Sequence, residues 1–192
     1  MKIDKKLFLF GALIFLLCLV FYFFINDSLV LFGFSGDTLF NGEIWRIITF
    51  NFVHVDMTHL IGNLIALIIT LILAYELELS GIDFLFVFFV SGIIIALIES
   101  LILPYVMIAG ASLGIYAVLG AITLKGKKFM PQYYFIILIL FSVLMNYMFT
   151  CKDCLNTSML LQAIFHLCGF FIGLGIYSLI LYEKKIHKIN AK

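Results

Sequence analysis

Long apolar runs separated by short polar stretches dominate the sequence. We predict one helix from each run, over residues 7–25, 59–75, 84–103, 112–124, 133–149 and 159–182. The first run has no charge from Leu7 to Ile25, and at about 1.5 Å per residue it can cross a hydrocarbon layer of roughly 30 Å. A cleaved signal peptide is the alternative, but no small-residue cleavage site follows it. Only the connection 26–58 is long, so we expect one domain over residues 1–192.

Lysine and arginine are unevenly distributed among the connections between these runs. Ten precede the first predicted helix, separate the fourth from the fifth, or follow the sixth: Lys2, Lys5, Lys6, Lys125, Lys127, Lys128, Lys184, Lys185, Lys188 and Lys192. The other connections hold only Arg46 and Lys152. Because basic residues collect on the cytoplasmic side, six crossings would place both termini in the cytoplasm. The connections 26–58, 104–111 and 150–158 would then face outward.

Composition supports a membrane protein. Hydrophobic residues make up 65% of the chain and charged residues 12%, whereas soluble domains carry about 25% charged residues. The predicted fold class is therefore an all-α, multi-pass integral membrane protein with six transmembrane helices in a lipid bilayer. A net charge of +1 gives no reason to expect a nucleic-acid partner. Eleven lysines against one arginine suggest an AT-rich bacterial genome, and hence a bacterial plasma membrane.

The four cysteines do not indicate a metal site. Cys18 and Cys168 lie in apolar runs, where cysteine usually serves packing. Cys151 and Cys154 form a C-x-x-C pair in the last outward connection, and they either form a small disulfide or stay reduced. A zinc site would need two further ligands, which the neighbouring sequence lacks. We therefore predict no metal and no cofactor.

Ser112 is the first unusual polar residue inside the apolar runs. The run that it opens has 13 residues and ends before Lys125, so its helix is about 10 Å too short to span the membrane. Residues 104–111 must then dip into the membrane beside protein or a wet cavity. A serine at a buried helix start lies among free backbone N–H groups, which suit an oxyanion. The alternative is a simple helix N-cap.

His166 is a second costly polar residue, because it lies well inside the last apolar run. Gly169 and Gly173 share its helical face, and such a face allows another helix to approach closely. The helix at Ser112 offers Gly110, Gly114, Ala117 and Gly120 as a matching small-residue face. Packing of these faces could bring His166 to Ser112, where it could act as general base. The alternative is a histidine that hydrogen-bonds to a backbone carbonyl.

Five further polar side chains accompany this pair. His59 and Asn63 are four residues apart on one helical face, so they suit either an oxyanion hole or helix packing. Tyr116 lies one turn after Ser112 and either stacks on the imidazole or fills core space. Glu99 has no catalytic role in this interpretation, and His54 is expected to be partly solvated in the outward connection. No carboxylate is placed to complete a triad, which favours a Ser–His dyad.

Taken together, these residues resemble the rhomboid family of intramembrane serine proteases. The similarity covers most of the chain. Trp45-Arg46 resembles the family's tryptophan–arginine pair in the first outward connection, and His59-x-x-x-Asn63 resembles its oxyanion residues. Gly110-x-Ser112 resembles the nucleophile motif, with Tyr116 as the stacking aromatic and Gly120 as a further glycine of that helix, and His166-x-x-Gly169-x-x-x-Gly173 resembles the base motif. Two positions depart from the family pattern, because Leu113 stands where glycine usually follows the serine and Phe165 stands where the family has a small residue.

The resemblance implies a rhomboid-like bundle with a short central fourth helix and a serine endopeptidase that uses Ser112 and His166. His59, Asn63, Gly110 and Leu113 would border the oxyanion and substrate, while Trp45, Arg46, Tyr116, Gly169 and Gly173 would support the site. Its partners would be single-span transmembrane proteins, cut from the outward face. The alternatives are a catalytically inactive rhomboid-like protein that binds or escorts membrane clients, and a small transporter with a polar path through His59, Asn63 and His166.

Overall fold

The computed structural model describes residues 4–150 and 157–190, and these residues form helices without any extended strand. Six of the helices are long: α1 (Lys5–Phe23), α5 (Met57–Glu76), α6 (Gly81–Ile102), α7 (Ser112–Gly126), α8 (Gln132–Thr150) and α9 (Thr157–Asn190). Each corresponds to one predicted apolar run. The ends were predicted less well, because α9 continues eight residues beyond the predicted end at 182. Those residues include four charged side chains but no glycine or proline that would stop a helix.

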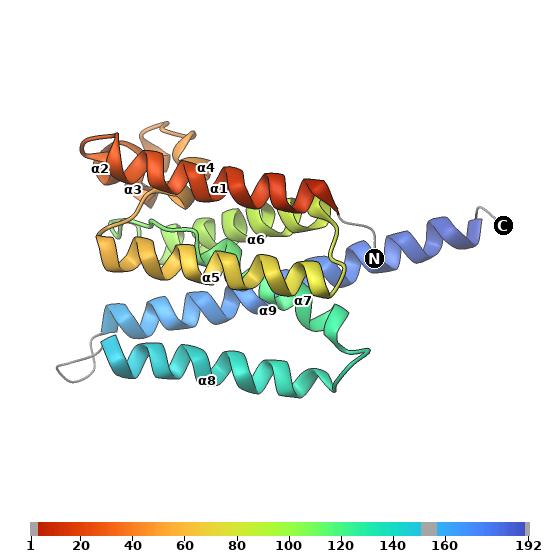
Figure 1. The fold of residues 1–192 in the computed structure, drawn as a ribbon. Coiled ribbons are helices and arrows are strands. Elements are labelled where there is room, and N and C mark those ends of the chain that lie inside the picture. The colour runs from red at the N-terminus through yellow and green to blue at the C-terminus, as the bar shows by residue number, and fades with distance from the viewer. Residues whose placement is uncertain (1–3, 151–156, 191–192) are drawn as a thin grey trace.

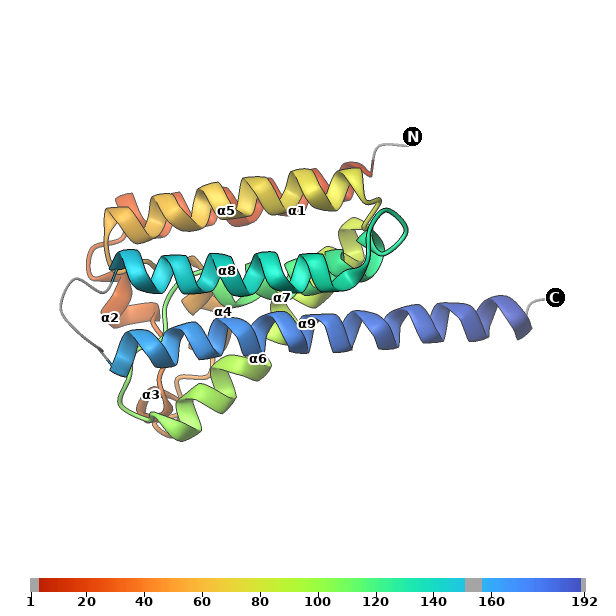
Figure 2. The same ribbon diagram turned by 90° about the horizontal axis from the view of Figure 1, so that it is seen from below.

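The six long helices run in alternating directions, and the two ends of the chain lie toward the same end of the bundle (Figure 1). Helix α7 is central, since it packs against α5, α6, α8 and α9. Helix α1 packs against α5 and α6 on the opposite side of the bundle from α8. The last part of α9 projects beyond the other helices, as the view from below also shows (Figure 2).

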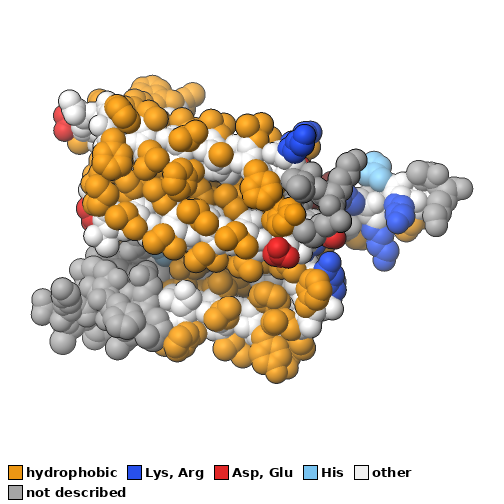
Figure 3. Space-filling model, viewed as in Figure 1, with side chains coloured by type: hydrophobic (Ala, Val, Ile, Leu, Met, Phe, Trp, Pro, Cys, Tyr) orange, Lys and Arg blue, Asp and Glu red, His pale blue; other side chains and the backbone are white. Residues whose placement is uncertain are grey.

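Four of these helices are long and apolar enough to cross a membrane, namely α1, α5, α6 and α9. Helix α7, with 15 residues, is apolar but shorter, as predicted from its run. Apolar side chains cover the visible surface of the bundle in a broad band, with basic side chains toward the end where the termini lie (Figure 3). Large side chains such as Leu13 and Ile65 are more than half exposed within that surface. The chain is a multi-pass integral membrane protein, because only lipid tails can cover so much apolar surface favourably.

Charged contacts tie the helices together at the end of the bundle that holds the termini. The carboxylate of Asp4 caps α1 and also accepts a hydrogen bond from the N–H of Gly81, the first residue of α6. The ammonium of Lys184 lies 2.6 Å from the carboxylate of Asp83, which joins α9 to α6. The ammonium of Lys125 donates to the carbonyl of Glu78. These contacts attach α1, α7 and α9 to the start of α6 and to the connection before it.

The long connection between α1 and α5 folds into four short helices: α2 (Ser28–Phe32), α3 (Gly36–Phe40), α4 (Arg46–Thr49) and the 3-10 helix η1 (Phe50–Phe52). The Arg46 guanidinium donates to the carbonyls of Val30 and Gly33 and also pairs with the Glu43 carboxylate. A two-hydrogen-bond bridge then joins Phe34 to Ile108, four residues before Ser112. The connection is thereby attached to the segment that leads into α7.

The C-x-x-C pair at Cys151 and Cys154 lies outside the described residues, as does Lys152. Cys18 is fully buried and contacts the carbonyl of Asn51 through its thiol. Cys168 is exposed on α9, so it is not the buried packing residue that the apolar run suggested. A membrane helix is apolar on its lipid-facing side too, and hydropathy alone does not separate that side from the core.

Candidate active site

Ser112 is the first residue of α7, and Ala111 occupies the cap position before it. The alternative role of Ser112 as an N-cap is therefore wrong. The first N–H groups of a helix have no partner within the helix, and no side chain caps this end of α7. Ser112 thus lies beside unpaired backbone donors and at the positive end of the helix dipole, an environment that favours developing negative charge.

The backbone before Ser112 is held in an uncommon conformation at Gly110. Its φ of +111° is one that residues with a side chain rarely adopt, and its N–H donates to the carbonyl of Phe50 at 2.9 Å. A Cβ at this position would lie 2.8 Å from the His59 ring. Two constraints, one conformational and one steric, therefore require glycine here, and the second one exists only because α5 brings His59 to this place.

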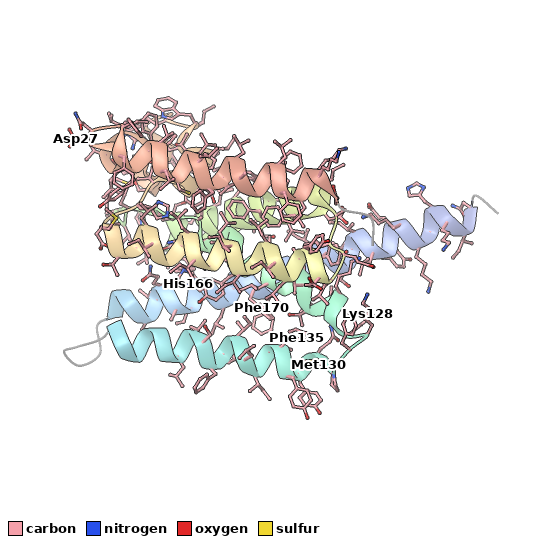
Figure 4. All side chains as sticks on the ribbon, viewed as in Figure 1. Asp27, Lys128, Met130, Phe135, His166 and Phe170 are labelled. Carbon is pink, nitrogen blue, oxygen red and sulfur yellow. The ribbon has the colours of Figure 1, made fainter. Side chains whose placement is uncertain are left out.

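The imidazole of His166 contacts Ser112. Its Nε2 lies 2.8 Å from Oγ of Ser112, although the two residues are 54 positions apart in the chain. His166 is 7% exposed, and it lies on α9 one turn before Phe170 (Figure 4). If Nε2 accepts the serine proton, the ring hydrogen must reside on Nδ1. No carboxylate hydrogen-bonds to this histidine among the described residues, in keeping with a pair instead of a triad.

Tyr116 stacks on His166, with ring centroids 4.6 Å apart and an interplanar angle of 17°. The flat contact limits rotation of the imidazole about its χ2 bond. The sequence left two roles open for Tyr116, stacking on the imidazole or filling core space, and the structure contains the stacked arrangement.

Helices α7 and α9 approach each other closely because of glycine at three contact points. A Cβ at Gly173 would collide with the backbone of Ala117, and one at Gly120 would collide with the backbone of Phe170. A Cβ at Gly169 would lie 3.2 Å from the Leu113 carbonyl. Gly114 was expected on the same face, but it faces the ring of Phe88 on α6 instead. The reason is that α7 is surrounded by helices, so it needs small residues on more than one side.

His59 and Asn63 both lie beside Gly110. The amide nitrogen of Asn63 donates to the carbonyl of His59 at 2.9 Å, and it would lie 3.6 Å from a Cβ on Gly110. The oxygen of the same amide is buried and has no hydrogen-bond partner in the described structure. Since an amide nitrogen carries two hydrogens, Asn63 retains one donor near Gly110. Asp56 caps α5 by accepting a hydrogen bond from the His59 N–H at 2.7 Å. This cap fixes the start of the helix that carries His59 and Asn63.

His54 is the residue that the sequence interpretation misjudged. It was expected to be partly solvated, but it is 3% exposed and its ring meets the His59 ring, with centroids 5.2 Å apart. Burial, together with the neighbouring His59, lowers the pKa of His54 to about 4. The signal in the sequence was the apolar pair Phe52 and Val53 directly before His54, and both of these residues are buried.

The remaining predicted residues divide into a buried group and an exposed one. Arg46 is buried and organises the first connection, whereas Trp45 is half exposed and its indole donates no hydrogen bond among the described residues. Leu113 and Phe165, the two departures from the family pattern, are both buried in one apolar cluster with Phe34 and Phe50. The larger side chains at these two positions therefore belong to one buried cluster that also includes residues of the first connection.

Comparison with known families supports this arrangement. The model of the Rhomboid domain matches residues 41–183, well over half of the chain. The chain belongs to the rhomboid family. A search of curated proteins found no match. The rhomboid segment begins just before Arg46 and ends beside Lys184, so it contains the first connection from α4 onward and every residue of the candidate site.

Rhomboid proteins are intramembrane serine proteases, and inactive members of the family also exist. Family membership does not by itself assign roles to single residues. The structure brings the His166 imidazole into contact with Ser112 and Tyr116, and it places His59 and Asn63 beside Gly110. Their catalytic roles remain predictions, and the described residues contain no group of three or more His, Cys, Asp or Glu arranged for a metal ion.

Proposed function

We propose that this protein is an intramembrane serine endopeptidase that cleaves the transmembrane segments of single-span membrane proteins. The observation that carries the proposal is the 2.8 Å contact between Nε2 of His166 and Oγ of Ser112 inside a rhomboid bundle. An ionisable residue and a hydroxyl are expensive to bury within a membrane, and such groups usually have functional roles. A serine with a hydrogen-bonded imidazole is also the minimal arrangement for nucleophilic catalysis.

In the proposed mechanism, Nε2 of His166 takes the proton of Ser112 as Oγ attacks the peptide carbonyl. The oxyanion receives hydrogen bonds from the unpaired N–H groups at the start of α7, from His59 and from the free amide hydrogen of Asn63. His166 then gives its proton to the leaving amine, and water cleaves the acyl-enzyme with the same histidine as base. Tyr116 keeps the imidazole plane aligned throughout.

The proposal includes the arrangement of the protein in the membrane. All six long helices would cross the bilayer, with α7 short because its start lies below the outer surface, and residues 1–192 would form one domain. Both termini would be cytoplasmic in a bacterial plasma membrane, and the site would open to the outer face. The basic residues at the end of the bundle that holds the termini support this orientation.

A fluorophosphonate probe tests the function directly, because such probes react covalently with activated serines. We expect the purified protein in detergent to be labelled, and Ser112→Ala or His166→Ala to lose labelling and cleavage of a single-span substrate. Ser100→Ala is the matched control, since Ser100 is another buried serine in a membrane helix but its hydroxyl bonds to the Leu97 carbonyl. Labelling that survives Ser112→Ala would reject the dyad, and no labelling of folded wild type would favour an inactive, client-binding rhomboid protein.

A further inference from the structure

His54 lies in the short connection between η1 and α5, outside both helices. Its Nδ1 is 3.3 Å from the carbonyl of Phe52. A carbonyl only accepts, so Nδ1 carries the ring hydrogen and Nε2 bears a lone pair. That Nε2 is buried without a partner in the described structure. His54 is therefore a neutral ring fixed by one backbone contact, and its orientation is set before any substrate binds.

The His59 ring is in contact with two fixed groups. The His54 ring meets it edge to face at an interplanar angle of 64°. The backbone of Gly110 approaches it so closely that no Cβ would fit at that position. The backbone of His59 is fixed as well, because Asp56 accepts its N–H and Asn63 donates to its carbonyl. The ring is thus restricted in its χ1 and χ2 rotations by residues from two separate segments.

We propose that His54 is a positioning residue that holds the His59 ring against Gly110, so that a ring N–H of His59 points to the oxyanion throughout the reaction. This inference rests on the proposed protease function. Donors that stabilise an oxyanion act best when they are oriented in advance, because reorienting them during the reaction costs free energy. A ring that lost its support at His54 could rotate away from Gly110 toward the space that His54 had filled. His54 itself touches neither Ser112 nor substrate in this arrangement.

The charge state of His54 fits this role. Burial and the adjacent His59 lower its pKa, while the carboxylate of Asp56 acts in the opposite direction. A neutral ring can pack edge to face on its neighbour, whereas a protonated one would repel any positive charge on His59. Burial therefore keeps His54 in the form that supports His59 at physiological pH.

A double-mutant cycle with His59 distinguishes positioning from a merely structural role. The second-order rate of probe labelling and the kcat and KM of cleavage are measured for wild type, His54→Ala, His59→Ala and the double variant. We expect His54→Ala to lower kcat roughly tenfold to a hundredfold with little change in KM, in line with the cost of misplacing a reacting group. In the His59→Ala background the same substitution should change the rate less than about twofold, because the ring that it positions is already gone.

Two further variants exclude loss of folding as the cause. Val53→Ala removes an equally buried side chain from the same connection. It should retain the wild-type rate although it loses about as much thermal stability as His54→Ala does. His54→Phe keeps a flat ring and should retain most of kcat. Equal effects of His54→Ala in both His59 backgrounds, or a Val53→Ala variant as slow as His54→Ala, would overturn the inference. Absence of labelling in wild type would instead reject the proposed function itself.

Discussion

Two residues show how strongly single positions determine the candidate site. Gly110 has a positive φ and a neighbouring imidazole that leaves no room for a side chain. Ser112 lies two residues later, at the first position of a helix without a side-chain cap. A shift of one residue in the start of α7 would turn the hydroxyl away from His166, since successive helical residues are rotated by about 100°. The chemistry of the site therefore depends on where one helix begins.

Asn63 offers a graded test of the oxyanion assignment. We expect Asn63→Ala to lower kcat by about tenfold to a hundredfold, since one donor is lost while backbone donors remain. The losses for Ser112→Ala and His166→Ala should be much larger. Cleavage of a single-span substrate at saturating concentration measures the effect. A variant that fails to fold, or one that cleaves at the wild-type rate, would contradict a catalytic role for this amide.

The pKa of His54 predicts a dependence of stability on pH. Its pKa is about 4 in the folded protein, against an ordinary value of 6.5, so between these pH values the unfolded chain binds a proton that the folded one does not. The stabilising contribution of the neutral ring is complete above about pH 6.5 and is lost progressively as the pH falls to about 4. Thermal unfolding at pH 7.5 and pH 5 should therefore differ less for His54→Phe than for wild type. If the difference in unfolding midpoint between the two pH values were the same in both proteins, the lowered pKa of His54 would be contradicted.

At the scale of helices, the central contact is the packing of α7 on α9. Most membrane helices gain little from apolar burial against each other, because lipid tails are equally apolar, and they depend on close van der Waals packing instead. Gly120, Gly169 and Gly173 provide that closeness and also set the distance between Ser112 and His166. Packing and catalysis are thus coupled through the same interface.

This coupling predicts different outcomes for two glycines on the same helix. Gly173→Ala would force Cβ into the Ala117 backbone, so we expect a loss of about 1–3 kcal/mol in stability and reduced probe labelling. Gly175→Ala is the matched control, since nothing lies within 4 Å of its added Cβ, and a helical alanine there should be neutral or stabilise by up to about 1 kcal/mol. Unfolding midpoints in a detergent series measure both. Equal effects of the two substitutions would show that the interface is not closely packed.

At the scale of the whole molecule, the described lysines lie toward one end of the bundle and the first connection toward the other. The ion pair of Lys184 with Asp83 and the hydrogen bond from Lys125 to the Glu78 carbonyl both involve lysines at the first of these ends. Figure 4 shows Asp27 and Lys128 at opposite ends. This separation of charge is what the uneven distribution of lysine had indicated.

Cysteine accessibility tests the proposed orientation. In a variant without native cysteines, Lys188→Cys should react with an impermeant maleimide only after the membrane is opened, whereas Asp27→Cys should react in intact cells. Leu13→Cys is a control, because it lies mid-helix on the lipid-facing surface of α1 and should resist labelling in both conditions. Reaction of Lys188→Cys in intact cells would reverse the topology.

The sequence determined the elements and the candidate residues, because the signals for these are local. Each apolar run corresponds to one helix, and the helix that begins at Ser112 is short, as expected. The glycines at positions 169 and 173 face α7, which was also expected. Hydropathy and helical periodicity depend only on neighbouring residues, so they can be identified without a fold. The same reasoning could not place helix ends accurately, since a lysine-rich continuation of α9 has no stop signal.

Only the tertiary structure decided several of the contacts between helices. The contact of Gly114 with Phe88 on α6 and the shared apolar cluster of Leu113 and Phe165 arise between segments far apart in the chain. The first connection joins the segment before Ser112 through the Phe34–Ile108 bridge, for which the sequence carries no pattern. Contacts of this kind depend on the relative rotation and depth of packed helices. A local pattern specifies which face of a helix is small or polar, but the neighbour that covers this face is chosen by the whole bundle.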